Sequence, residues 1–463
     1  MTPFFLAFTN LHEYKDKAKY FSGIFGLNQN LIAINRKLLV SRFLTRSGDQ
    51  AWDFALPLTL VFILSNRIDI VAAIYLLSKL GSVLFQPWAA RFIDRAPRLR
   101  TAALGVTLQV VSLAVVTLTT FVLYKYFKLP SELNFPTQVC LFVIVIGSIL
   151  TNLGSGIMEI AVGNDWVPAI VEQNHLPAFN SRMRQLDLFC EVGAPIVAGA
   201  LLILSVPEVP LLGFLSIAAW NVISFVPEIY LLKSVFNSSP QLQKDFVQQN
   251  EDSKKGIFSK LFEGWSEFRK QACLPAMVAY AFLWLSVLSP HGVLLTSFLN
   301  GGWHLSEASL GLFRGLGAIF GLLATIIFPR VSRSLGLRIS TGIFIAFQAL
   351  MVALALVFFI FPIANGFVFL AFILLSRIGL YGFSLGEIEI RQRLIPEGVR
   401  GIINGTANSL TGLATVLLFA FGSYYSTPNT FPILIWISTV SVICGSIIYI
   451  YWAAKKSTVR YFK

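Results

Sequence analysis

The stretch FNSSPQLQKDFVQQNEDSKK, residues 236–255, divides this 463-residue chain into two halves. It is the only long hydrophilic segment in a sequence otherwise dominated by apolar runs. About twelve such runs are long enough to cross a bilayer as helices, which takes about 20 residues each, and half of them lie on either side of the stretch. We therefore expect an all-α polytopic membrane protein with twelve transmembrane helices in two six-helix bundles. The expected spans are 36–64, 68–92, 101–127, 137–160, 184–206, 210–234, 274–299, 306–329, 338–362, 365–390, 401–424 and 430–454.

The composition supports a chain whose surface faces lipid. Hydrophobic residues make up 56% and charged residues 13%, and the mean hydropathy is +0.71, whereas soluble domains carry about 25% charged residues. Soluble enzymes, secreted disulfide scaffolds and disordered chains are therefore excluded. The net charge of +13 indicates contact with anionic headgroups rather than nucleic acid, because basic residues of membrane proteins gather in cytoplasmic loops. The four cysteines lack C-x-x-C spacing, so no zinc site is indicated.

Basic residues follow the second, eighth, tenth and last apolar runs, and the odd-numbered connections are almost free of them. This asymmetry predicts that both termini are cytoplasmic in a cell inner (plasma) membrane. Ile257, Leu261, Trp265 and Phe268 share one helical face within the linker, which predicts a helix lying on the headgroups. The expected parts are an N-terminal segment (1–35), a first bundle (36–235), a linker (236–272), a second bundle (273–455) and a tail (456–463).

The first apolar run carries the densest set of polar residues. Thr45, Asp49 and Asp53 recur at i, i+4 and i+8 and so lie along one face of a helix. A carboxylate at the bilayer centre costs about 2.5–3.5 kcal/mol on insertion scales, so these residues are candidates for function. Gly48 weakens the helix locally and could free backbone carbonyls as ligands. The structural alternative is that the two aspartates pair with Arg46 or with a cation of another helix.

The sixth run offers a matching face. Asn221, Ser224 and Glu228 fall at i, i+3 and i+7 around Pro227, and Gln109 is a lone amide in the third run. Hydroxyl, amide and carboxylate oxygens suit a hard or borderline divalent cation such as Fe²⁺, Mn²⁺ or Ca²⁺. Helix packing through polar side chains is the alternative for Ser224 and Gln109.

The seventh run contains Ser289-Pro-His-Gly292, which predicts a broken helix that lines a cavity. His291 within this break is a candidate nitrogen ligand or proton acceptor, or a structural histidine. The sequence has no H-x-x-x-H pair and no phosphate-binding G-x-x-x-x-G-K-[ST] loop, so catalytic zinc and ATP-driven pumping are not expected.

The two halves have similar sequences at one basic turn. Arg95, Leu99 and Arg100 match Arg333, Leu337 and Arg338 at a constant offset. Two six-helix halves with this turn resemble the major facilitator superfamily, although Ala90 stands where that superfamily's motif usually has glycine. The resemblance implies a substrate site between the halves and rocking of one half against the other. Charged and polar residues at the cytoplasmic helix ends would either be solvated or form a latch between the halves; they are Asp94, Arg95, Asp165, Asn180, Arg184, Asp187 and Arg400.

Six stretches resemble the ferroportin family, most closely its bacterial members. They are LTRSGDQAWDFALP (44–57), VGNDWVPAIV (162–171), RMRQLD (182–187), WNVISFVPE (220–228), SRIGLYGF (376–383) and RGIINGTANSL (400–410). The resemblance implies export of ferrous iron and other divalent transition metals. It places a metal site at Thr45, Asp49, Asn221, Ser224 and the Phe225 backbone, with Gln109 nearby, and a cytoplasmic gate at Asp94, Asp165, Asn180, Arg184, Asp187, Arg400 and Gly401.

The chain departs from the animal members at their second metal site. The positions of that site's cysteine and histidine read Gly292 and Leu418 here, so we expect the second site to be absent unless His291 replaces it. The resemblance also implies that a peptide hormone regulates the animal members through the same cysteine. We expect this regulation to be absent here.

Our leading hypothesis is a monomeric secondary transporter that exports Fe²⁺, and also Co²⁺, Ni²⁺ or Mn²⁺, by alternating access, with protons as a candidate counter-ion. It needs no cofactor and no protein partner, although Ca²⁺ fits the same oxygen site. The alternative is a proton-coupled multidrug exporter of the same fold, in which Asp49 would neutralise an organic cation. A membrane-embedded enzyme would need a nucleophile and a base close together, and the sequence indicates neither.

Overall fold

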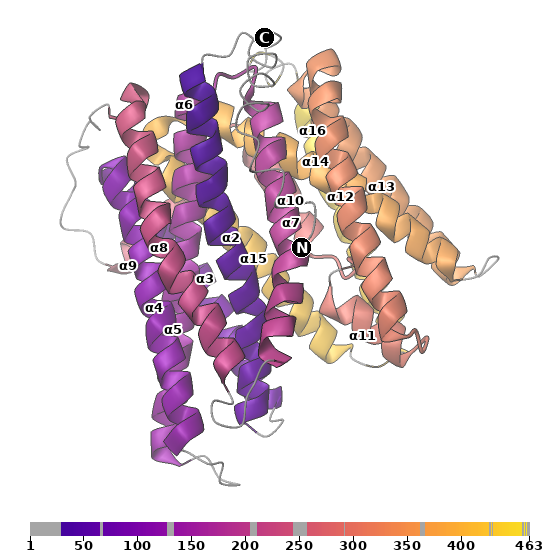
Figure 1. The fold of residues 1–463 in the computed structure, drawn as a ribbon. Coiled ribbons are helices and arrows are strands. Elements are labelled where there is room, and N and C mark those ends of the chain that lie inside the picture. The colour runs from indigo at the N-terminus through magenta and orange to yellow at the C-terminus, as the bar shows by residue number, and fades with distance from the viewer. Residues whose placement is uncertain are drawn as a thin grey trace, which may run out of the picture.

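The computed structural model describes residues 29–64, 68–126, 134–203, 211–243, 257–290, 292–361, 366–425, 427, 429–455, 458 and 460. Regular secondary structure in these ranges is helical throughout. The helices run roughly side by side in two bundles, the first coloured indigo to magenta and the second orange to yellow (Figure 1). The expected all-α fold is therefore confirmed.

The first bundle contains the helices that precede the hydrophilic stretch. They are α2 (Gln29–Ile63), α3 (Ile68–Arg95), α4 (Arg98–Tyr126), α5 (Phe135–Met158), the π-helix η2 (Glu159–Trp166), α6 (Val167–Ile170), α7 (Leu176–Ile203), α8 (Leu212–Ser238) and the short η3 (Pro240–Leu242). The segments α5, η2 and α6 form one continuous span.

The second bundle follows the linker helix α9 (Ile257–Arg269). Its helices are α10 (Leu274–Trp284), α11 (Val293–Gly301), α12 (Glu307–Leu335), α13 (Leu337–Ile360), α14 (Phe367–Leu394), the short η4 (Glu397–Val399), α15 (Arg400–Tyr424) and α16 (Phe431–Ala454).

Ten helices in the described part are long and apolar enough to cross a membrane on their own. The first expected span, α2, is absent from these ten because it carries several charges, among them Arg42, Arg46 and Asp49. The seventh span is divided between α10 and α11, each too short to cross alone. With these two the described part contains twelve spanning segments, as expected from hydropathy.

The break in the seventh span is stabilised by side chains from two neighbouring helices. Arg377 Nη2 of α14 donates a hydrogen bond to the Leu288 carbonyl at 2.6 Å, and the Val287 amide donates to Ser438 Oγ of α16 at 2.8 Å. These bonds satisfy backbone groups that the interrupted helix leaves unpaired. Gly292 lies at the start of α11, and His291 lies outside the described residues.

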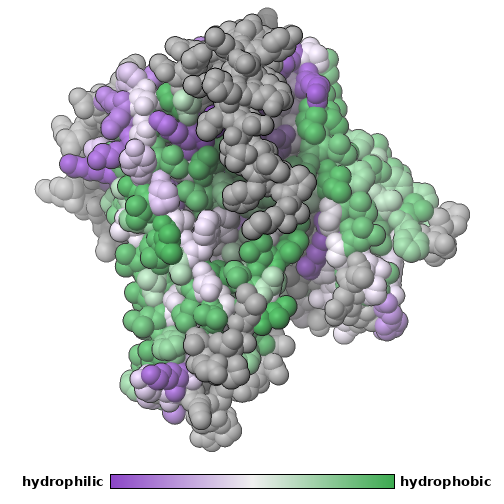
Figure 2. Space-filling model, in the orientation of Figure 1, coloured by the Kyte–Doolittle hydropathy of each residue, from purple (hydrophilic) through white to green (hydrophobic). Residues whose placement is uncertain are grey.

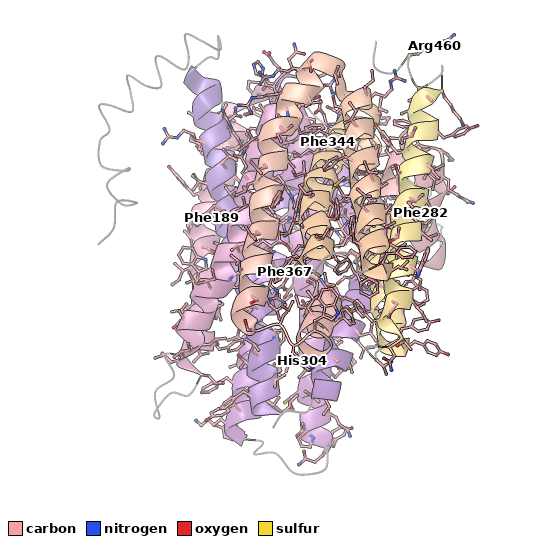
Figure 3. The ribbon with its side chains drawn as sticks, turned by 90° about the vertical axis from the view of Figure 1, so that its right-hand side faces the viewer. Phe189, Phe282, His304, Phe344, Phe367 and Arg460 are labelled. Carbon is pink, nitrogen blue, oxygen red and sulfur yellow. The ribbon has the colours of Figure 1, made fainter. Side chains whose placement is uncertain are left out.

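Apolar side chains cover the flanks of both bundles, and hydrophilic ones gather towards the two ends of the molecule (Figure 2). Phe189 is 58% exposed on such a flank, whereas Phe344 is buried between helices (Figure 3). His304, before α12, and Arg460, after α16, lie at opposite ends of the second bundle (Figure 3). This distribution is what a lipid-facing surface requires.

Helix α9 packs against other helices of the protein. Phe268 is 3% exposed and belongs to the core of the second bundle. For this residue the expectation of a face resting on headgroups is wrong, because α9 packs against α3 and α15, one helix from each half.

The halves meet where α3 packs on α15, where α7 packs on α12 and α14, and where η2 packs on α15 and α14. A small apolar cluster of Leu188, Ala324 and Tyr381 lies in the contact that α7 makes. Several of the expected gate residues lie at these contacts, and the expected metal-site residues lie within the first bundle.

Candidate functional site

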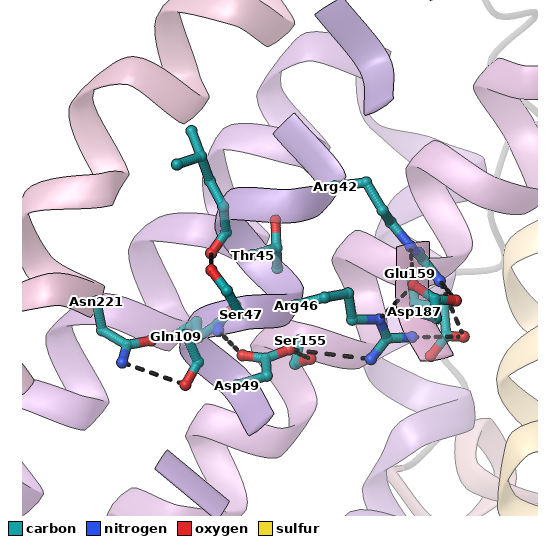
Figure 4. Close-up of polar contacts among 12 residues, drawn as sticks. Arg42, Thr45, Arg46, Ser47, Asp49, Gln109, Ser155, Glu159, Asp187 and Asn221 are labelled. Carbon is teal, nitrogen blue, oxygen red and sulfur yellow. Dashed lines mark hydrogen bonds and ion pairs between the residues drawn. The ribbon is translucent and has the colours of Figure 1, made fainter. Parts of the chain in front are cut away.

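Asp49 lies near the middle of α2 and points into the first bundle (Figure 4). Its Oδ1 accepts a hydrogen bond from Gln109 Nε2 of α4, and its Oδ2 accepts one from Ser155 Oγ of α5 at 2.7 Å. The side chain is 12% exposed. Two neutral donors from two other helices therefore orient this carboxylate without neutralising its charge.

Asn221 of α8 lies directly against α2. Its Nδ2 donates to the carbonyls of Gly48 at 3.3 Å and Ile217 at 3.1 Å. A methyl group added at Gly48 would lie 2.3 Å from Asn221 Oδ1, so only glycine permits this approach. Contrary to the expectation of a weakened helix, α2 runs unbroken through Gly48, because its packing against α8 supports the backbone there.

The remaining predicted ligands lie one to two turns along the same helix pair. Thr45 Oγ1 lies 2.5 Å from Glu228 Oε1, and Ser224 Oγ donates to the Asn221 carbonyl within α8. Phe225 packs against the apolar cluster beside α8. The structure thus brings residues from the first, third and sixth spans together along one stretch of α2.

Sequence reasoning named Arg46 as an alternative partner of Asp49 but missed the wider ion network around this arginine. Arg46 Nη2 lies 2.9 Å from Glu159 Oε1, Nε lies 3.5 Å from Asp187 Oδ1, and Nη1 lies 4.0 Å from Asp49 Oδ2. Arg42 donates to both Asp187 oxygens at 2.8 and 2.7 Å. The i, i+4 spacing of Arg42 and Arg46 was visible in the sequence, but their partners on η2 and α7 were not.

Except for Asp187, these residues line an open pocket with about 300 Å³ of empty space, part of it outside the protein surface. Its walls are Ser41, Arg42, Thr45, Arg46, Asp49, Ser155, Met158, Glu159 and Val162. Glu159 opens the π-helix η2, and its side chain is 43% exposed towards this space. Single π-helical turns inside α-helices are frequent at functional sites.

Asp53 lies one turn beyond Asp49 and lines a second open pocket, with about 490 Å³ of empty space that extends beyond the protein surface. Tyr75 and Lys79 of α3 and Asn152 of α5 share its wall. The first and second pockets therefore follow each other along α2.

Among the described residues, no three His, Cys, Asp or Glu side chains form a cluster that could hold a metal by themselves. A metal at Asp49 would therefore depend on amide and hydroxyl oxygens.

Several of the predicted gate residues join the two halves. Asp94, at the end of α3, accepts hydrogen bonds from the amides of Gly401 at 2.7 Å and Ile402 at 2.8 Å, the first turn of α15. A carboxylate at a helix N-terminus is favourable because it pairs with free amides and with the helix dipole. Asn180 Nδ2 of α7 donates to Gln392 Oε1 of α14 at 2.7 Å.

Asp165 binds two arginines, one from each half. Arg98 Nε lies 2.7 Å from Asp165 Oδ2, and Arg400 Nη1 lies 3.8 Å from Oδ1. The Arg184 guanidinium stacks over the Tyr381 ring at 4.7 Å, again between halves. These contacts close the end of the molecule at which α3 ends and α15 begins.

One predicted gate residue, Asp187, binds Arg42 within the first half. Arg95 follows Asp94 at the end of α3, with an exposed side chain. Gln392, which sequence reasoning did not select, also donates to the Gly163 carbonyl of η2 at 2.8 Å. The π-helix therefore contacts both the first pocket, through Glu159, and the contact between the halves.

Comparison with known proteins gives consistent matches over nearly the whole chain. The Ferroportin1 (FPN1) family model matches residues 33–442. The chain is 39% identical over 432 residues to Ferreportin of Bdellovibrio bacteriovorus, covering 93% of this chain and 97% of that protein.

Solved structures agree with this match. A bacterial homologue of the iron transporter ferroportin in an outward-facing state superposes with a TM-score of 0.82 at 38% identity, covering 91% of this chain and 100% of that chain. An inward-facing structure at 38% identity gives 0.64, covering 93% and 100%. The proton:xylose symporter XylE, at 12% identity and covering 90% and 94%, has a TM-score of 0.64 and shares the fold.

The two bundles, the broken seventh span and the polar pocket thus define a multi-pass membrane transporter of the major facilitator fold. Within that class, the chain belongs to the ferroportin family. This is a family of transporters and not of enzymes, and its bacterial homologues include structures described as iron transporter homologues.

Proposed function

We propose that this protein exports divalent transition-metal ions, with Fe²⁺ as the main cargo and Co²⁺, Ni²⁺ and Mn²⁺ as further cargo. It would work by alternating access as a monomer in the plasma membrane, with both termini cytoplasmic. The names of its relatives as iron transporters support the choice of cargo. Solved structures of a bacterial homologue in an outward-facing and an inward-facing state support motion between two such states.

The single observation that carries the proposal is the environment of Asp49. Its carboxylate is held by Gln109 and Ser155 without an ion pair closer than 4.0 Å among the described residues. The Asn221 amide donates a hydrogen bond to the carbonyl of Gly48, the residue before Asp49. Carboxylate, amide, hydroxyl and carbonyl oxygens are ligands of hard and borderline divalent cations, and the same set would accept Ca²⁺. A carboxylate must be deprotonated to bind metal, so transport should slow at acidic pH, and proton antiport belongs to the proposal.

Replacing Asp49 by Ala tests the site. We expect Co²⁺ flux through proteoliposomes to fall at least about tenfold, equivalent to about 1.4 kcal/mol, while the protein stays monodisperse. Glu172→Gln, at an exposed carboxylate between α6 and α7, is the matched control and should transport normally. Unchanged Co²⁺ flux in Asp49→Ala would remove the site, and flux of a lipophilic cation in place of Co²⁺ would favour a multidrug exporter.

A further inference from the structure

Arg46 holds a central place in the pocket beside Asp49. Its guanidinium lies 2.9 Å from Glu159, 3.5 Å from Asp187 and 4.0 Å from Asp49 (Figure 4). These three carboxylates come from η2, α7 and α2, so one side chain is shared among three elements. The side chain of Arg46 is 18% exposed, which leaves it mostly shielded from solvent.

The partners of Arg46 are not equally dependent on it. Asp187 already receives two hydrogen bonds from Arg42 at 2.8 and 2.7 Å. Glu159 is 43% exposed, so water can solvate its charge. Asp49 is 12% exposed and has only neutral hydrogen-bond donors. A move of the guanidinium towards Asp49 would therefore cost its other partners little.

The charge balance points the same way. The guanidinium groups of Arg42, Arg46 and Arg184 face the carboxylates of Asp49, Glu159 and Asp187 within 4.0 Å, so these six groups are neutral together when all are ionised. A divalent ion at Asp49 would turn this into two positive charges in excess. Bound metal and a guanidinium close to Asp49 are therefore mutually unfavourable.

We propose that Arg46 is a tethered cation that takes the place of the metal's charge at Asp49 once the metal has been released. The inference rests on the proposed function. Before a carrier can load again, its site must pass through closed states, where an uncompensated carboxylate is costly. Arg46 compensates Asp49 there, so the unloaded carrier returns without another metal at this carboxylate. When metal binds, Arg46 turns to Glu159 and Asp187.

Two consequences follow for an Arg46→Gln variant. The variant binds metal more tightly, because the competing positive charge is gone. It also returns slowly when unloaded, because Asp49 is then unpaired in the closed states. Exchange of metal for metal across the membrane needs no unloaded return and continues. A purely structural role for Arg46 would reduce exchange and net flux together.

The experiment uses the purified full-length protein. Co²⁺ binding is measured by calorimetry, and both net Co²⁺ flux and Co²⁺/Co²⁺ exchange are measured in the same proteoliposomes. For Arg46→Gln we expect a Kd about tenfold lower, exchange close to wild type and net flux reduced at least tenfold. Arg36→Gln, an exposed arginine of the same helix, should match wild type in all three. Arg46→Lys keeps the charge and should keep a ratio of net flux to exchange within about threefold of wild type.

An unchanged Kd together with an unchanged ratio in Arg46→Gln overturns the inference. If Arg46→Gln supports no exchange at all, Arg46→Lys tests the inference instead. A net flux of Arg46→Lys that falls relative to its exchange also overturns the inference. Absence of Co²⁺ binding and flux in wild type and Arg36→Gln would instead refute the proposed function itself, so the two failures are distinguishable.

Discussion

At the scale of single residues, the site depends on how closely α8 can approach α2. Asn221 reaches the Gly48 carbonyl because residue 48 has no side chain. The same contact holds the Asn221 amide on the residue that precedes Asp49. A small change in side-chain volume at position 48 therefore acts directly on the proposed ligands.

Gly48→Ala is expected to impair transport and to destabilise the first bundle by about 1–3 kcal/mol, the usual cost of overpacking. The added methyl group would lie 2.3 Å from Asn221 Oδ1, so the amide must move away from α2. Thermal unfolding and Co²⁺ flux measure the two effects. Gly193→Ala, where an added methyl group meets no atom within 4 Å, is the control, and equal behaviour of the two variants would contradict the packing argument.

At the scale of elements, α9 lies across the contact between the two halves. Arg91 of α3 forms an ion pair with Glu263 of α9. A methyl group added at Gly264 would lie 2.7 Å from Thr406 Oγ1 of α15 and 3.2 Å from Pro87 of α3. Because α9 contacts one helix of each half, separating α3 from α15 must break part of its packing.

Gly264→Leu should therefore weaken closure at this end of the molecule. We expect a larger distance between spin labels placed at Arg100 and Lys455, exposed positions of the first and second half, in a background without native cysteines. Pulsed electron resonance reports the distance distribution. Gly315→Leu, at a glycine of α12 with no atom within 4 Å of an added methyl group, should leave the distribution unchanged, and a similar result for Gly264→Leu would argue against a role of α9 in closure.

At the scale of the whole molecule, the described polar contacts between the halves close one end. Asp94 binds the first turn of α15, Asp165 binds arginines from both halves, and Asn180 binds Gln392. Rocking of one bundle against the other must exchange these contacts for solvent. The free energy of this gate therefore sets how often that end opens.

Asp94→Asn should shift the carrier towards the state that is open at this end. An asparagine cannot accept both amide hydrogens of Gly401 and Ile402 as a carboxylate does, and losing one such bond costs about 1–2 kcal/mol, or a five- to thirtyfold change in population. The label pair at Arg100 and Lys455 measures this population. An unchanged distribution would show that Asp94 contributes little to closure, and Glu172→Gln serves as the exposed control.

Sequence alone determined the number of spans, the break at Ser289-Pro-His-Gly292 and the polar face of α2, because hydropathy, proline and glycine act locally along the chain. The resemblance of its motifs to the ferroportin family is likewise written in the order of residues, and the comparisons confirmed it. Only the tertiary structure decided that Arg46 is shared by Asp49, Glu159 and Asp187, that Asp187 belongs to Arg42, and that Phe268 is buried in the second bundle. These features depend on which side chains come within about 4 Å of each other. That distance follows from how the helices pack, and it cannot be read from the order of the residues alone.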